Sequence, residues 1–402
     1  MIPLLSRWIG RLAWLLVAAA VAACTGRSTP LANDAYVWQR QWTPALVRAV
    51  AEDGSSVRAW RVLAGEMDGQ GRWRVFTPDW NALAASGKPV VAVVRIEGQL
   101  QQWDEAMLLA DVQAILATWR QQKFVLAGVE IDHDCATSRL PAYTHFLQAL
   151  RPSLLPNERL SLTALPTWLD SPHLDALLAQ ADEAVLQVHA VQSPRAGLFN
   201  PDTARGWLSA FARHTHKPWR VALPAYGTRV SWDDQGRVSV IESERPTLVG
   251  TEGASELFAD PRVMQRFVST LESDAPEGLA GIVWFRLPTG EDARAWSEAS
   301  WRSVLGRTPL KASLTAIAGG TDDPHRYDVR LVNEGDADLP LPSLVRVEGS
   351  CAAADGINGY GLQRSGQGLY LQRTRVGVLR AGRQLAVGWL RCDTPPTLHV
   401  ES

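Results

Sequence analysis

Three acidic residues alternate along one short stretch of this 402-residue sequence. The run Ala127-Gly128-Val129-Glu130-Ile131-Asp132-His133-Asp134 is strongly apolar before its acidic end, as in a buried β-strand. Side chains of a strand point alternately to its two faces, so Glu130, Asp132 and Asp134 share one face. Carboxylates crowded in this way repel each other, and crowding with burial raises the pKa of at least one of them. The run therefore predicts a general acid that works near neutral pH. The alternative is a solvated acidic loop.

Other polar and aromatic residues stand near the ends of neighbouring apolar runs. Arg95 follows Val91 and Val93 at alternate positions, so it is either a partner for the carboxylate row or a salt-bridged rim residue. Gln187 and His189 share a face two residues apart, and His189 either lines a site or is structural. Trp38 is a candidate surface on which a sugar ring stacks.

Eight such runs precede or separate helical patterns along the chain. They cover residues 35–42, 57–65, 88–96, 124–132, 159–165, 183–191, 218–226 and 279–287. Their lengths and β-branched residues are typical of buried parallel strands. Eight strand–helix units predict a (β/α)₈ TIM-type barrel of the α/β class over residues 35–305. A doubly wound open sheet is the alternative, but no glycine-rich phosphate loop follows the first strand. Active sites of such barrels lie at the C-terminal ends of the strands.

Helix starts are marked by a capping side chain followed by proline. Such pairs are Thr43-Pro44, Thr77-Pro78, Ser171-Pro172, Asn200-Pro201 and Asp260-Pro261. Apolar residues at one-face spacing predict helices over 103–120 and 138–150. Between strand seven and its helix, residues 229–257 form an excursion that we expect on the catalytic rim, with a hairpin turn at 233–236.

The last part of the chain has a different pattern. Residues 306–402 contain short strand-like runs separated by turn residues, which predicts a small β-sandwich. Cys351 and Cys392 both lie in this region, and an oxidising compartment would permit a disulfide bond between them. No cysteine and histidine set has zinc-like spacing, so we expect no structural metal and no cofactor.

The first residues have the character of a targeting segment. Arg7 and Arg11 precede an apolar stretch that is too short to span a bilayer as a helix. Val21-Ala22-Ala23-Cys24 resembles the bacterial lipobox, which implies a signal peptide over 1–23, acylation of Cys24 and a tether over 24–34. Thr25 favours the outer membrane, with the protein facing the periplasm. The alternative is an ordinary signal peptide.

Composition excludes some classes of function. The formal net charge is −2, so no basic surface for nucleic acid is expected. The apolar fraction of 46% rules out global disorder. Seventeen tryptophans are unusual beside six tyrosines and eight phenylalanines, and they indicate an aromatic core, a stacking surface or both.

Three motifs resemble the family 18 glycoside hydrolases, the chitinase type. The acidic run is similar to that family's D-G-x-D-x-D-x-E, with Ala127 and Asp134 replacing its first Asp and its Glu. Leu223-Pro224-Ala225-Tyr226-Gly227 is similar to G-x-P-x-Y-G on strand seven, and Gly281-Ile282-Val283-Trp284 to G-x-x-x-W on strand eight. Residues 35–290 also resemble a proteobacterial lipoprotein family whose domain has no assigned function, through VWQRQW, GVEIDHD, LQVH and LPAYG.

The resemblance implies retaining hydrolysis assisted by the substrate's own N-acetyl group. Asp134 would protonate the leaving oxygen, Asp132 would orient the acetamido group, and Glu130 would tune their pKa values. Trp284 would stack on the sugar and Tyr226 would line the same subsite. At strand six Gln187-Val188-His189-Ala190 replaces the family's Met-x-Tyr-Asp.

Four functional hypotheses therefore remain. The first is a lipid-anchored, glycoside-hydrolase-like protein that cleaves an N-acetylated or related polysaccharide. The second is a non-catalytic carbohydrate-binding barrel of the cell envelope. The third is a divalent-metal hydrolase that uses Glu130, Asp132, Asp134 and His189. The fourth is a barrel that serves only as a scaffold.

Overall fold

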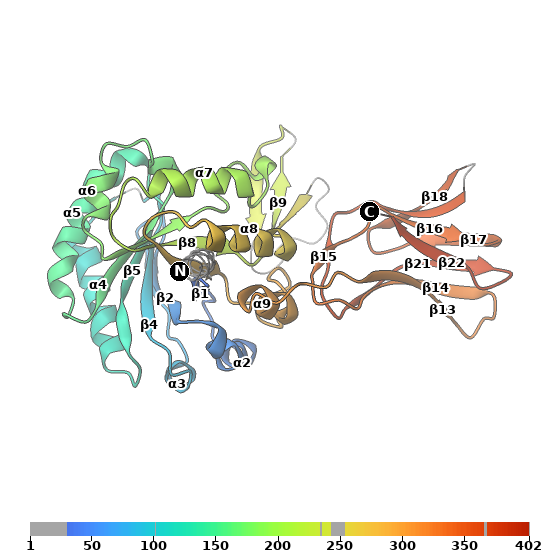
Figure 1. Ribbon diagram of the computed structural model, residues 1–402, viewed down its shortest axis with the longest axis horizontal. Coiled ribbons are helices and arrows are strands. Elements are labelled where there is room, and N and C mark those ends of the chain that lie inside the picture. Colours follow the sequence, from blue (N-terminus) through green and yellow to red (C-terminus); the bar gives the residue numbers. More distant parts are fainter. Residues whose placement is uncertain (1–29, 101, 234, 243–253, 366–367, 402) are drawn as a thin grey trace, which may run out of the picture.

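A closed parallel barrel forms the larger part of the molecule. The computed structural model describes residues 30–100, 102–233, 235–242, 254–365 and 368–401. The barrel strands are β1 (Ala32–Val37), β2 (Ala59–Met67), β4 (Val90–Ile96), β5 (Leu126–His133), β6 (Arg159–Ala164), β7 (Glu183–Gln187), β8 (Trp219–Pro224) and β12 (Leu279–Phe285). Pairing of β1 with both β12 and β2 closes the ring (Figure 1). The predicted barrel is thus confirmed, and each of its strands overlaps the run of residues predicted for it.

Helices cover the outside of this ring. They are α2 (Pro44–Asp53), α3 (Trp80–Ala85), α4 (Glu105–Arg120), α5 (Leu140–Leu150), α6 (Leu174–Leu178), α7 (Pro201–Phe211), α8 (Pro261–Ser273) and α9 (Glu298–Leu305). The side chains of Thr43, Asn200 and Asp260 cap α2, α7 and α8 as predicted.

Two predicted helix starts are wrong. The first follows Thr77-Pro78, where the helix begins two residues later because Asp79 accepts a hydrogen bond from the Ala82 amide, 2.9 Å away. The second follows Ser171-Pro172, where the Ser171 hydroxyl instead accepts from the His173 amide in a turn before α6.

Seven of the seventeen tryptophans are almost completely buried in the core of the barrel. The tryptophans that are almost completely buried are Trp60, Trp119, Trp168, Trp219, Trp284, Trp296 and Trp301. They pack in the layer between the strands and the surrounding helices. Large aromatic side chains bury much apolar area each, so this layer contributes strongly to stability.

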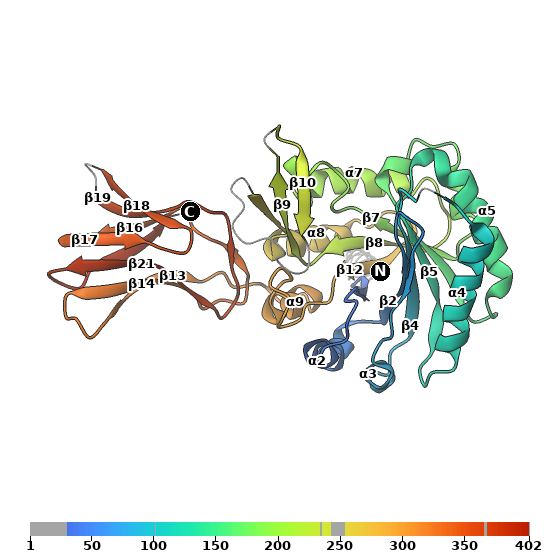
Figure 2. The same ribbon diagram turned by 180° about the vertical axis from the view of Figure 1, so that it is seen from behind.

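An antiparallel sheet is inserted between β8 and α8. It consists of β9 (Gly227–Trp232), β10 (Val238–Glu242) and β11 (Ala254–Phe258), with β9 in the centre. The Asp233 amide donates to the Arg237 carbonyl, which closes the predicted hairpin turn between β9 and β10. Figure 2 shows this sheet standing beside the barrel, next to β8. The excursion therefore extends one rim of the barrel.

The C-terminal region is built from antiparallel strands around its own core. One sheet contains β13 (Leu314–Gly320), β14 (Arg326–Asn333), β21 (Gln384–Cys392) and β17 (Cys351–Gly356). Another contains β18 (Tyr360–Ser365), β19 (Gly368–Arg373), β16 (Leu344–Glu348) and β22 (Thr397–Glu401), and β15 (Leu339–Pro340) pairs with β20 (Val378–Leu379). This arrangement is consistent with the predicted small β-sandwich. A disulfide bond joins Cys351 to Cys392 across β17 and β21.

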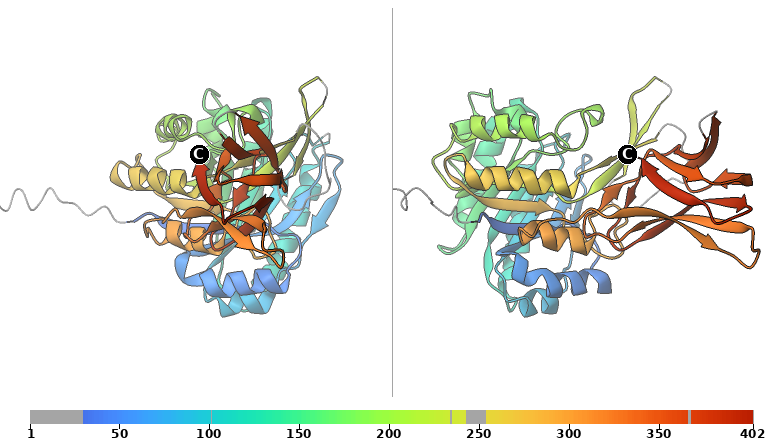
Figure 3. Two further views of the ribbon diagram at one scale, coloured as in Figure 1. Left: turned by 90° about the vertical axis from the view of Figure 1, so that its right-hand side faces the viewer. Right: turned by 45° about the vertical axis from the view of Figure 1, so that its right-hand side comes forward.

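A buried carboxylate connects the two regions. Asp338 is completely buried, and its oxygens accept hydrogen bonds from the Ser297 amide at 2.7 Å and the Ala381 amide at 2.9 Å. The Ser300 hydroxyl contacts the Asp338 amide at 2.8 Å. Ser297 and Ser300 belong to the start of α9, so the C-terminal region docks on that helix (Figure 3).

The chain enters the barrel at the end where the strands begin. Leu31 is held there by its amide, which donates to Glu272, and by its carbonyl, which accepts from Arg307. Residues 1–29, including the predicted signal segment 1–23 and Cys24, lie outside the described residues. Among the residues that are described, no helix is both long and apolar enough to cross a bilayer.

Candidate functional site

A cavity of about 610 Å³ opens at the C-terminal ends of the barrel strands. Strand-end residues that line it are Trp38, Arg95, Asp132, Asp134, Gln187, His189, Tyr226 and Phe285. Most of the predicted site residues are thereby brought together. Its size lies within the range of small-molecule sites in proteins, which are concave and mostly apolar with a few converging polar groups.

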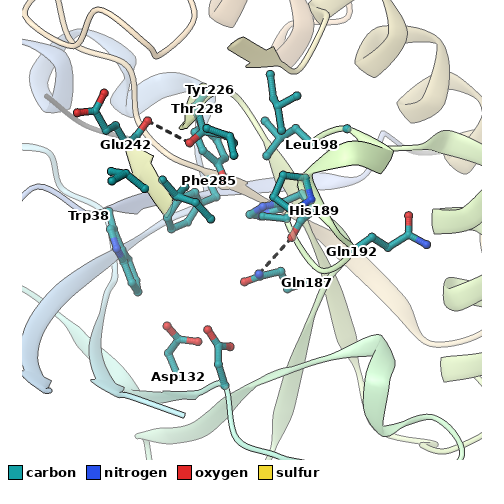
Figure 4. Close-up of a pocket in the computed structure, with 18 of the residues that line it drawn as sticks. Trp38, Asp132, Gln187, His189, Gln192, Leu198, Tyr226, Thr228, Glu242 and Phe285 are labelled. Atoms are coloured by element: carbon teal, nitrogen blue, oxygen red, sulfur yellow. Dashed lines mark hydrogen bonds between the residues drawn. The ribbon is translucent and has the colours of Figure 1, made fainter. Parts of the chain in front are cut away.

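Asp132 and Asp134 form the acidic side of the pocket (Figure 4 labels Asp132). Asp132 is only 7% exposed, and its Oδ1 atom has no hydrogen-bond partner among the described residues. Burial first, and then the charge of Asp134, raise the pKa of Asp132 well above its usual range. Burial likewise raises the pKa of Asp134, although its side chain reaches solvent and the positive charge of Arg95 lowers this pKa. One of the two carboxyls can therefore hold a proton near neutral pH.

Two glycines allow the close backbone contacts that position Asp132 and Asp134. Gly98 lies in the loop after β4, and Gly128 lies on β5 itself. A Cβ atom at Gly98 would lie 1.9 Å from the Asp134 carbonyl oxygen, so the loop after β4 can pass there only without a side chain. Gly128 has φ +148°, and a Cβ atom would lie 1.9 Å from the Arg159 carbonyl oxygen on β6. Both positions exclude any side chain on steric grounds.

Arg95 has the second of the two roles that its spacing allowed, a salt-bridged rim residue. Its guanidinium pairs with Glu66 at 3.0 Å and with Glu97 at 3.2 Å, at the rim of the pocket. It thus belongs to a salt-bridged rim, while its charge still lowers the pKa of Asp132 and Asp134.

Glu130 faces the barrel interior as predicted but does not line the pocket. It is completely buried below Asp132, where it contacts the Tyr36 hydroxyl and forms an ion pair with Arg61. Its carboxylate is engaged by partners inside the barrel, so the position of Glu130 allows the predicted tuning of its neighbours' pKa values but no contact with a ligand in the pocket. Its remaining influence is electrostatic, since its charge contributes to the raised pKa of Asp132.

His189 and Gln187 face the same cavity at the end of β7. His189 is 3% exposed, and neither Nδ1 nor Nε2 has a hydrogen-bond partner among the described residues. Burial lowers the pKa of His189 to about 3, so the ring is neutral and offers one donor and one acceptor. The Gln187 amide donates to the His189 carbonyl at 3.2 Å (Figure 4). Buried polar atoms normally have partners, so these nitrogens indicate a ligand or water in the cavity.

Three aromatic rings line the pocket beside His189. The Phe285 ring centroid lies 5.2 Å from that of Trp38 and 5.4 Å from that of Tyr226. Burial raises the pKa of Tyr226 to about 12, so its hydroxyl stays protonated. Such rings offer flat apolar faces to a ligand.

Trp284, predicted as the sugar-stacking residue, lies elsewhere. It is completely buried, its ring packs against Trp296 and Trp301, and its indole nitrogen donates to Asn33 at 3.0 Å. The reason is strand alternation: Val283 and Phe285 point into the barrel, so Trp284 points outward to α9. Phe285 takes the pocket position, and counting this alternation would have found it.

Sequence reasoning missed the opposite side of the pocket. Leu198 in the loop after β7 and Thr228, Val230, Val240, Ile241 and Leu257 on the inserted sheet line it. The sequence predicted that the insertion lies at the catalytic rim, but its aliphatic residues had no recognisable spacing. Figure 4 places Leu198, Tyr226 and Thr228 across the cavity from Asp132.

Two further features concern metal binding and the free cysteine Cys135. In the part of the chain that the structure describes, no three His, Cys, Asp or Glu side chains could share a metal ion. The Glu130 carboxylate, one of the ligands in the metal hypothesis, is paired with Arg61. Cys135 is buried, and burial raises the pKa of its thiol to about 12, which makes it unreactive.

Comparison with known proteins identifies a family. Residues 86–290, just over half of the chain, match the model described as "Domain of unknown function (DUF3142)". Residues 318–393 match a second model, "Domain of unknown function (DUF8456)". No curated protein matches the sequence.

Several solved structures are similar in fold. A chitinase from Chromobacterium violaceum ATCC 12472 is 15% identical with a TM-score of 0.48, over 68% of this chain and 98% of that one. The Bacillus cereus spore cortex-lytic enzyme SleL is 15% identical with a TM-score of 0.49, over 70% and 75% of the chains. A chitinase from Bacteroides thetaiotaomicron is 12% identical with a TM-score of 0.49, over 64% and 90%. At these values the likeness concerns the fold alone.

Proposed function

The chain belongs to the family described as "Domain of unknown function (DUF3142)", and we propose that it is a glycoside hydrolase of N-acetylated or related polysaccharides. One observation carries the proposal: two adjacent carboxyls with raised pKa values face a cavity at the C-terminal ends of the barrel strands. A carboxyl that keeps its proton near neutral pH can give it to a glycosidic oxygen.

Asp134 is the proposed general acid. It is the more exposed carboxyl of the two, so it can reach the oxygen of the bond that breaks, while Asp132 lies deeper. As the bond between the anomeric carbon and the leaving oxygen breaks, the proton of Asp134 moves to that oxygen. The acetamido oxygen of the sugar attacks the anomeric carbon. Water then attacks the same carbon, the bond to the acetamido oxygen breaks, and the proton of the water returns to Asp134. The two carboxyls share one proton, so when Asp134 carries it Asp132 is a carboxylate, which orients the acetamido group and stabilises its positive charge.

His189 and Gln187 are the proposed binding groups for polar atoms of the sugar. The neutral ring of His189 has two nitrogens without partners among the described residues, and they can meet one acceptor and one donor of a ligand. Trp38, Tyr226 and Phe285 supply the apolar surface on which the face of a sugar ring rests.

The test of this proposal compares two Asp-to-Asn variants. Soluble protein that begins after Cys24 is incubated with N-acetylated oligosaccharides and peptidoglycan fragments, and products are identified by mass spectrometry. Asp134→Asn is expected to lower kcat by about 10²- to 10⁴-fold, the usual contribution of a general acid. Asp175→Asn is the control, because Asp175 lies exposed on α6 outside the pocket. Unchanged turnover in Asp134→Asn would refute the assignment.

A second candidate is a barrel that binds carbohydrate without cleaving it. The observation that favours it is the solvent exposure of Asp134, because a general acid works best in a shielded site. In that case oligosaccharide binding persists with no product over days. Asp132→Asn would then weaken binding, whereas Asp134→Asn would not.

We also propose that Cys24 carries a lipid and anchors the protein at the outer membrane, facing the periplasm. The lipobox-like Val21-Ala22-Ala23-Cys24 and the Thr25 that follows it support this assignment.

A further inference from the structure

The pocket has two chemically different ends. The strand-end side carries Asp132, Asp134 and Gln187, whereas the opposite side is aliphatic, with Leu198, Val230, Val240, Ile241 and Leu257. Figure 4 shows Asp132 and Leu198 on opposite sides, with His189 and Phe285 between them. One continuous cavity thus joins a polar end to an aliphatic end.

The aliphatic end does not suit a bare sugar. Sugar hydroxyls need hydrogen-bond partners, and valine, leucine and isoleucine side chains supply none. The polar side chains of that end are engaged within the protein. The Thr228 hydroxyl donates to the Glu242 carbonyl at 3.0 Å, and the Glu242 carboxylate lies 3.6 Å from the Arg294 guanidinium.

Ile241 adds a second, independent observation. It is 58% exposed, it lies on β10, and it lines the pocket together with buried aliphatic residues. It stands opposite Val230 of β9 in the strand register, and Val230 is completely buried. An aliphatic strip therefore runs from the closed interior of the pocket to its opening, where it meets water. Covering such a strip releases apolar surface from water, which favours binding.

We propose that this aliphatic strip, Leu198, Val230, Val240, Ile241 and Leu257, binds an acyl chain on the nitrogen of the sugar whose ring lies at Asp132 and Asp134. The ligand is then an N-acylated amino sugar with a chain longer than acetyl. This inference rests on the proposed function, because that function places the acetamido group at Asp132, in the cavity that His189 also lines. From His189 the cavity continues toward Leu198, and a longer substituent follows the same direction.

The chain length provides the first measurement. Binding of N-acetylglucosamine and N-octanoylglucosamine to the soluble protein is measured by calorimetry. Each buried methylene tightens binding by about fourfold, so even partial burial of the octanoyl chain gives at least a tenfold gain. Octyl glucoside and free octanoate are the comparison ligands. Octyl glucoside carries an eight-carbon chain on the anomeric oxygen instead of the nitrogen, and octanoate carries one without any sugar. Neither ligand is expected to show this gain in affinity.

Two matched variants locate the chain. Ile241→Ser is expected to weaken binding of N-octanoylglucosamine by about fivefold or more and to leave N-acetylglucosamine unchanged. Val238→Ser is the control, because Val238 is also exposed on β10 but does not line the pocket. It should change neither affinity.

The outcomes separate this inference from the proposed function. Equal affinity for the acetyl and octanoyl sugars, or equal losses for both in Ile241→Ser, overturns the acyl site and leaves the proposed function intact. Octyl glucoside binding as tightly as N-octanoylglucosamine would also overturn it, because the chain would not depend on the nitrogen. Binding of N-octanoylglucosamine that is unaffected by Asp132→Asn overturns the sugar placement on which both rest.

Discussion

Two acidic residues on β5, Glu130 and Asp132, lie two positions apart and have opposite surroundings. Glu130 contacts the Tyr36 hydroxyl and Arg61, and Ser161 and Thr163 each lie 3.3 Å from its oxygens. Asp132 is nearly as buried, but its Oδ1 atom has no partner among the described residues. The same strand therefore carries two different carboxyl groups. Glu130, inside the barrel, has hydrogen-bond and ion-pair partners for its oxygens, whereas Asp132, nearer the pocket, has an oxygen without a partner among the described residues.

The lower region is a closed ionic network. Arg61 is almost completely buried and pairs with Glu130, Glu183 and Asp34. Arg220 pairs with Glu183 at 2.9 Å, which adds a second guanidinium. Each charge has an opposite partner, so removing one partner would leave a buried charge uncompensated, which is costly. Buried charges that are all paired in this way are typical of a structural core. Buried polar groups without partners, such as Asp132 and His189 at the pocket, cost stability and are typical of a binding site.

The largest effect is expected when the lower network is broken. Arg61→Met leaves three buried carboxylates without their shared partner, which should lower the free energy of unfolding by about 3–5 kcal/mol or prevent folding. Urea denaturation measures this change. The control is Arg72→Met, which removes an exposed ion pair with Asp68 and should cost at most about 1 kcal/mol. Similar losses in the two variants would show that the network does not stabilise the barrel.

The pocket residue His189 should make the stability of the protein depend on pH. Burial lowers the pKa of His189 from its usual 6.5 to about 3, so below pH 6.5 the unfolded chain takes up a proton that the folded protein does not. Its contribution to stability is present above pH 6.5 and is lost as the pH falls. Between pH 7 and 4.5 this loss is roughly 2–3 kcal/mol.

The measurement compares urea midpoints at the two pH values in wild type and His189→Gln. The variant should lose less stability on acidification than the wild type. His133 remains in both proteins and contributes its own loss, since burial lowers its pKa to about 4. An identical pH dependence in the two proteins would contradict a buried neutral His189.

The smallest effect is expected at Asp132 and has the opposite sign. Its pKa is raised in the folded protein, so stability falls as the pH rises from its ordinary value of 3.8 through the folded value. Asp132→Asn removes this titration and should leave stability nearly unchanged at pH 4 while raising it at pH 7. Thermal unfolding at both pH values checks this sign. If Asp132→Asn were less stable than the wild type at pH 7, Asp132 would stabilise the barrel as Glu130 does, and the prediction would be wrong.

The barrel could be predicted from the sequence because its signals are local. Buried parallel strands are short apolar runs, and Thr43, Asn200 and Asp260 mark helix starts with a cap followed by proline. The position of Asp132 and Asp134 follows from the same rule, since strand ends meet at one rim.

The rest of the site depends on long-range packing. Arg95 pairs with Glu66 from β2, and Glu130 with Arg61, across strands far apart in the sequence. Trp284 was assigned through a motif although alternation turns it toward α9. The aliphatic side of the pocket comes from the inserted sheet and the loop after β7, where no periodic pattern relates Leu198 to Val230.

The direction of the barrel strands fixes how an anchored molecule would stand on a surface. The chain enters β1 at the end where Leu31 contacts Glu272 and Arg307, and the pocket opens at the other end. Seven residues separate Cys24 from Ala32, and they reach at most about 25 Å when extended. A lipid at Cys24 would hold the closed end of the barrel near its leaflet and turn the mouth outward. A ligand would then arrive from the aqueous side, as a released fragment, rather than from the leaflet below.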